Sequence, residues 1–162
     1  MRTLDLVQLT VWSVRLCRLA EVDPLRVVAV LGVGTAPASY VRGVGRMEPA
    51  PLGTTRGEVS VVQGRFRSLT LTFAAPEITR HDLEDALGQG MPLRRTRPLG
   101  EHQVGYRVVV PDAPYSCDVV ASFPARPQPR SVATRVMLRR RPGCTAQARR
   151  TSAFGSAPVE RR

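Results

Sequence analysis

Two histidines and two of the three cysteines are the side chains of this chain that could act as a base or a nucleophile. His81 falls in a short helical stretch and His102 at the start of a strand, while Cys17 and Cys117 lie in apolar segments. Nucleophile and base meet in space rather than in sequence, so Cys117 with His102, or Cys17 with His81, stays open as a catalytic pair. No CxxC, HxH or HxxxH spacing is present, so the sequence predicts no zinc site.

Two further motifs have structural explanations. Asp82, Glu84 and Asp85 could bind magnesium, but acids in the first turns of a helix ordinarily complement its dipole. A GVG run beginning at Gly32 resembles a dinucleotide-binding loop, yet Pro37 stands where the third small residue belongs. We therefore expect a glycine turn there, no cofactor, no metal and no enzymatic activity. A further hypothesis is a small hydrolase or cyclase that works from a pocket between a helix and the sheet.

All 24 basic residues are arginines, and the net charge is +11. GC-rich coding would produce this bias, as would selection for guanidinium groups that bind phosphate or carboxylate. The complete absence of lysine favours the coding explanation, although the charge still attracts polyanions at low salt. The candidate anion-binding or partner-binding residues are Arg94, Arg95 and Arg97 in a loop, and Arg139, Arg140, Arg141, Arg149 and Arg150 towards the C-terminus.

Apolar periodicity and turn residues predict two helices and several strands. The best-marked helix has Thr79 as its N-cap and Gly88 as a left-handed C-cap. The clearest hairpin turns at Gln63-Gly64, with one face buried and the other wet. We expect helices over 4–21 (with Thr3 as N-cap) and 79–87, and strands over 25–31, 39–47, 58–62, 65–73, 103–110, 116–123 and 131–139.

This order predicts an α+β fold with a mainly antiparallel sheet and two helices. Helix followed by strands occurs twice, in residues 1–75 and 76–138, which suggests a tandem αβββ duplication with two joined or stacked sheets. A single mixed sheet with both helices on one face would give the same pattern. Residues 139–162 contain seven arginines and one glutamate, with few large hydrophobic residues, so we expect a disordered Arg-rich tail after a single domain over 1–138.

The cysteines and the N-terminus indicate a cytoplasmic protein. Cys17 and Cys117 fit buried, unpaired small hydrophobes, and Cys144 in the tail would be a free thiol, which suits a reducing compartment. The first residues lack the apolar core and cleavage site of a signal peptide, and no apolar run reaches the length of a membrane span.

Residues 68–88 (SLTLTFAAPEITRHDLEDALG) and 104–123 (VGYRVVVPDAPYSCDVVASF) resemble small uncharacterised α+β proteins of high-GC actinobacteria, over about residues 58–138. The likeness lies in an alternating strand, a Pro-led capped helix and a strand pair turning at Pro111 to Pro114. It implies a partner-binding or immunity-type module. The leading hypothesis is therefore a non-enzymatic module that binds an unknown protein through its sheet face or a loop. The alternative is a nucleic-acid-associated protein whose Arg-rich tail holds phosphates.

Overall fold

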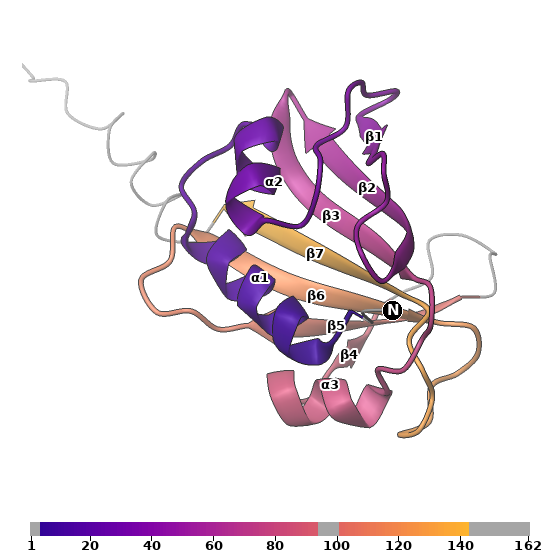
Figure 1. The fold of residues 1–162 in the computed structure, drawn as a ribbon. Helices are drawn as coiled ribbons and strands as arrows, with labels where there is room; N and C mark the ends of the chain where they lie inside the picture. Colours follow the sequence, from indigo (N-terminus) through magenta and orange to yellow (C-terminus); the bar gives the residue numbers. More distant parts are fainter. Residues whose placement is uncertain (1–3, 94–100, 143–162) are drawn as a thin grey trace, which may run out of the picture.

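Seven antiparallel strands form one sheet in the part of the chain that the computed structural model describes, residues 4–93 and 101–142. The order across the sheet is β1-β2-β3-β7-β6-β5-β4 (Figure 1). Strands β3 and β7 pair at its centre, so both parts of the chain share one sheet and the alternative of two stacked sheets is wrong. The fold is α+β as predicted, but the arrangement does not establish a duplication. The strands are β1 (Val44–Arg46), β2 (Thr54–Val62), β3 (Arg65–Phe73), β4 (Met91–Pro92), β5 (His102–Val108), β6 (Tyr115–Phe123) and β7 (Arg135–Pro142).

Helices α1 (Leu6–Arg18), α2 (Pro24–Leu31) and α3 (Arg80–Leu87) pack against one face of this sheet (Figure 1). The strands alternate, so one set of side chains meets the helices and the other set points away. The first set and the buried faces of the helices form one hydrophobic core, which includes Leu16 of α1 and Leu138 of β7. Below, the covered face is called the inner face and the opposite one the outer face.

The predicted strand over 25–31 is wrong, because this segment is helix α2. Asp23 caps it, with the Asp23 Oδ1 accepting a hydrogen bond from the Leu25 N–H at 3.1 Å, and Pro24 occupies the first helical turn. Gly32 ends it at φ +68°. The same apolar run suits a buried strand or a short buried helix, and these end signals decide for the helix.

Helix α3 and the hairpin are confirmed. Thr79 Oγ1 accepts from the Asp82 N–H at 3.1 Å, and Asp82 Oδ2 accepts from the Thr79 N–H at 2.9 Å, which completes a capping box. Gly88 ends the helix at φ +86° and ψ −175°, so it has the positive φ we expected but not the left-handed helical ψ. Gln63 and Gly64, both with positive φ, turn the chain between β2 and β3.

Other boundaries differ from the predictions. Helix α1 is capped by Asp5, whose carboxylate accepts from the Gln8 N–H at 2.8 Å, and Thr3 lies outside the described residues. Of the strand predicted over 39–47 only β1 forms. Its Gly45 is packed so closely that a Cβ there would lie 2.5 Å from the Pro37 Cβ.

Cys17 of α1 and Cys117 of β6 form a disulfide, with their Cα atoms 5.7 Å apart. The prediction of two unpaired cysteines is therefore wrong. Both residues are buried on the inner face, as expected, but the packing of α1 on β6 also brings them within bonding distance. Since the residues are 100 positions apart, no local pattern in the sequence indicates this pairing.

Candidate functional site

The predicted Arg-rich tail begins inside the sheet. Residues 139–142 form the end of β7, so the predicted domain boundary at residue 138 is too early. Register with β6 supplies the backbone partners that hold these residues in a strand. Of the remaining candidates, Arg94, Arg95, Arg97, Arg149 and Arg150 lie outside the described residues, as does Cys144.

Arg140 is not available to bind an anion, which corrects its place among the candidates. It points to the inner face and is 3% exposed. Its guanidinium donates to the Leu19 carbonyl at 2.9 Å and to the Glu21 carbonyl, and it lies 5.3 Å from the Phe66 ring centroid and 4.2 Å from that of Tyr115. Burial lowers the pKa of Arg140, but a guanidinium stays charged in proteins. Arg140 is therefore a structural cation at the C-terminal end of α1.

Arg139 and Arg141, by contrast, point to the outer face. Both donate to Asp118 Oδ2, at 3.0 and 2.7 Å respectively, so one carboxylate neutralises part of two positive charges. Asp118 is well shielded, with 12% of its side chain exposed, whereas the side chain of Arg141 is 52% exposed. Alternation along β7 thus separates three consecutive arginines into one buried residue and two surface residues.

The strand registers place further arginines on the outer face. Arg107 lies opposite Asp118, and Arg139 opposite Ser68. In the β1–β2 pair, Arg46 lies opposite Glu58, and in the β3–β7 pair, Arg135 lies opposite Thr72. The charged residues of the outer face are Arg46, Arg56, Arg65, Arg107, Arg135, Arg139, Arg141, Glu58 and Asp118, with Glu101 at its edge paired to Arg135.

The outer face is basic but carries charges of both signs. Glu58 pairs with Arg56, and Glu101 with Arg135. Within residues 4–93 and 101–142, Arg46 and Arg107 make no ion pair, and both are exposed. Between these charges lie the hydroxyl side chains Ser60, Ser68, Thr70, Thr72, Ser116 and Ser122 and the side chains of Met137 and Val120.

The structure removes both cysteine–histidine pairs as catalytic candidates, because Cys17 and Cys117 are bonded to each other. His81 is exposed and its Nε2 lies 3.3 Å from Asp85 Oδ2 on the same helix. His102 stands at the start of β5, as the sequence predicts.

The acids of α3 have local partners. Asp82 belongs to the capping box, and Glu84 Oε1 accepts from Arg80 Nε at 2.9 Å. No group of three histidine, cysteine or acidic side chains that could hold a metal ion occurs within the described ranges. Gly32 of the GVG run is the left-handed C-cap of α2, and the next element along the chain is strand β1, which agrees with the predicted glycine turn.

Burial also affects the one fully enclosed phenol. Tyr106 of β5 has no exposed surface, and its hydroxyl has no hydrogen-bond partner. Desolvation raises its pKa to about 12, with the nearby Glu84 carboxylate acting in the same direction. Tyr106 is therefore neutral at physiological pH and does not supply a base.

Sequence reasoning missed Arg46, Arg56, Arg107 and Arg135 as members of a surface. The sequence did contain a signal for this surface, namely the polar residues at alternate positions of each strand. It becomes a surface only when the strand order is known, because β7 inserts between β3 and β6 and aligns residues far apart in the chain.

Comparison with known proteins gives no relative from which a function could be transferred. The chain matches no protein-family model, no curated protein and no solved structure. The resemblance to actinobacterial proteins therefore remains an expectation. Among the described residues, no helix has both the length and the apolar composition needed to cross a membrane.

Proposed function

We propose that this protein is a non-enzymatic binding module that docks an acidic surface of a partner protein on its outer sheet face. The observation that supports this most directly is the one-sided packing of the fold. All three described helices lie on the inner face, while the outer face presents seven arginines against three carboxylates. A flat face with an excess of one charge favours a partner of the opposite charge.

The composition of the outer face favours a protein over a nucleic acid. Phosphate backbones are uniformly negative, and Glu58, Asp118 and Glu101 would repel them, whereas charges of both signs can match a protein surface. The strands place no aromatic side chain on this face for base stacking. Met137 is partly exposed among these arginines, and arginine and methionine are enriched in protein interfaces.

The nucleic-acid alternative loses part of its support. It relies on a free arm, but Arg139, Arg140 and Arg141 are ordered in β7, with Arg140 buried. The cytoplasmic assignment also loses support, because disulfides persist mainly in oxidising compartments. We infer that the protein works where Cys17 and Cys117 stay oxidised.

The test compares two anionic probes, a labelled poly-L-glutamate of 20 residues and a 20-base-pair DNA duplex, by fluorescence anisotropy across a salt series. The variant Arg46→Ala/Arg107→Ala removes two of the outer-face arginines that have no ion pair. The matched control, Arg18→Ala/Arg130→Ala, removes two exposed arginines from α1 and from the β6–β7 loop. Both variants lose the same charge.

We expect poly-L-glutamate affinity to fall about fivefold in the outer-face variant, and to change by less than about twofold in the control, at physiological salt. Equal losses in the two variants would mean that net charge alone attracts the probe, and the proposed docking face would be wrong. Tighter binding of DNA than of poly-L-glutamate, with the same dependence on Arg46 and Arg107, would replace the protein partner by a nucleic acid.

A further inference from the structure

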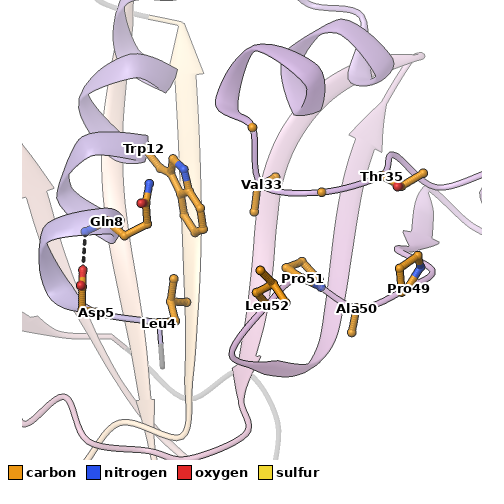
Figure 2. A pocket seen from close by; sticks show the side chains of 12 residues that line it. Leu4, Asp5, Gln8, Trp12, Val33, Thr35, Pro49, Ala50, Pro51 and Leu52 are labelled. Atoms are coloured by element: carbon orange, nitrogen blue, oxygen red, sulfur yellow. Dashed lines mark hydrogen bonds between the residues drawn. The ribbon is translucent and has the colours of Figure 1, made fainter. Parts of the chain in front are cut away.

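A cleft of about 740 Å³ opens on the helix side of the molecule, away from the outer face. One wall is the N-terminal half of α1, with Asp5, Gln8 and Trp12. The opposite wall comes from two loops, one after α2 and one between β1 and β2 (Figure 2). Its volume lies in the range of small-molecule sites, about 300–1,000 Å³.

Most of the cleft lining is apolar. Figure 2 shows the indole of Trp12 across the cleft from the loop that carries Pro49, Pro51 and Leu52, with Val33 on the loop after α2. The polar side chains of the lining are those of Asp5, Gln8 and Thr35. An apolar lining with a few polar groups that fix orientation is the usual composition of a ligand site.

The charge of the cleft is opposite to that of the protein. Among residues 4–93 and 101–142, no arginine lines the cleft, and Asp5 is the ionisable side chain of its lining. The Asp5 carboxylate accepts from the Gln8 N–H and remains exposed to solvent. Its negative charge partly offsets the positive end of the α1 dipole, and its exposed carboxylate is accessible to a ligand.

The end of helix α2 adds a second negative contribution. Its C-cap, Gly32, lines the cleft, and its last turn contains no basic residue to offset the negative end of the helix dipole. A third contribution is Trp12, whose indole lines the cleft and is the best aromatic partner for a cation. Asp5 and Trp12 lie on the α1 wall of the cavity, and Gly32 lies on the opposite wall.

We propose that this cleft binds a small organic cation: an apolar body against Trp12, Pro51 and Leu52, with an ammonium group near Asp5. Apolar burial provides attraction without selectivity, and the carboxylate, the α2 terminus and the indole select for positive charge. This site is independent of the outer face and of the partner proposed there.

Trp12 makes the proposal directly measurable, because it is the single tryptophan of the chain. The probes are phenethylammonium, 2-phenylethanol and 3-phenylpropionate, which share a phenyl group and a short chain and differ in charge. Titration of the full chain, followed by tryptophan fluorescence, should give saturable changes with affinities in the order cation, alcohol, anion.

Asp5→Asn is the key variant, because asparagine caps helices as well as aspartate and removes only the charge. We expect it to weaken phenethylammonium binding about threefold to fivefold while leaving 2-phenylethanol unchanged. The control is Asp112→Asn, an exposed acid of the β5–β6 turn at φ +57°, which asparagine tolerates. Ala50→Phe, which fills the cleft, should weaken both ligands.

Three results would overturn the proposal: equal affinities for the three probes, tightest binding of the anion, or no effect of Asp5→Asn on the cation. An equal effect of Asp112→Asn would also overturn it, because the charge would then act at long range rather than in the cleft. Asp112 is in the turn that leads into β6. Cys117 of β6 is bonded to Cys17 at the C-terminal end of α1, which is about 20 Å along the helix from Asp5.

Discussion

Cys117 and Arg140 lie directly opposite each other on β6 and β7, and both hold the C-terminal end of α1. Cys117 is bonded to Cys17 in the last turns of the helix. Arg140 donates to the carbonyls of Leu19 and Glu21, just beyond it. A covalent bond and a buried cation therefore fix the same helix end to neighbouring strands, so their loss should be felt in the stability of the whole fold.

Replacing Arg140 by alanine should lower the free energy of unfolding by about 2–4 kcal/mol. The change removes two aromatic contacts and leaves the Leu19 and Glu21 carbonyls without their donors. Arg140→Lys keeps the charge but not the planar fork, and should fall between wild type and alanine. Urea denaturation gives these values. Arg141→Ala, on the exposed side, is the control and should change the stability by less than about 0.5 kcal/mol; similar losses for the two alanine variants would contradict this account.

Reduction of the disulfide should destabilise the protein by about 2–4 kcal/mol, because the bond closes a loop of 100 residues. Denaturation with and without a reductant measures the effect. Cys17→Ala/Cys117→Ala should match the reduced wild type and no longer respond to reductant. Thiol titration of the denatured, unreduced chain should find one free thiol among its three cysteines, and three free thiols would show that the bond is absent.

Thr79→Ala should cost about 1 kcal/mol, since it leaves the Asp82 N–H without its acceptor and breaks the capping box of α3. Thr79→Ser keeps the hydroxyl and should retain most of the stability. Thermal unfolding of the two variants provides the comparison. If serine and alanine behave alike, the side-chain oxygen is not the stabilising group.

Stability should decrease in acid as two carboxylates become protonated. Backbone N–H groups of Asp23 and Val22 lower the pKa of Glu21 from 4.5, and the Thr79 N–H and hydroxyl lower the pKa of Asp82 from 3.8. Because both folded-state pKa values lie below these unfolded values, the stabilisation is complete above about pH 4.5 and is lost as the pH falls through the folded values.

Urea midpoints measured between pH 7 and pH 2.5 test this. The double variant Glu21→Gln/Asp82→Asn should be less stable at pH 7 and should show a flatter decline in acid. A decline as steep as that of the wild type would assign the acid sensitivity to other carboxylates.

Asp118→Asn should strengthen poly-L-glutamate binding about twofold to fivefold, because it releases Arg139 and Arg141 from their shared carboxylate. Anisotropy titration gives the affinity. Glu77→Gln changes the net charge equally at an exposed position outside the sheet and serves as the control. An equal gain in both variants would indicate that the outer face has no special role.

Features that depend on neighbouring residues could be predicted from the sequence. Thr79 and Asp82 specify a capping box within one turn, and Gln63-Gly64 specifies a hairpin, because both signals act over a few positions. The alternation in β2, β3, β5 and β6 likewise predicted an antiparallel sheet with a wet face. These elements form with little dependence on what packs against them.

Other features depend on contacts between segments that are distant in the sequence. The run over 25–31 satisfies either a buried strand or a short helix, and its position over β3 together with its end caps makes it α2. The role of Arg140 depends on β7 lying between β3 and β6, which brings Phe66, Tyr115 and the end of α1 around it. The Cys17–Cys117 pair, the outer face and the cleft beside Trp12 all join segments distant in sequence. Their contacts exist only after the chain has closed those loops, so no local pattern encodes them.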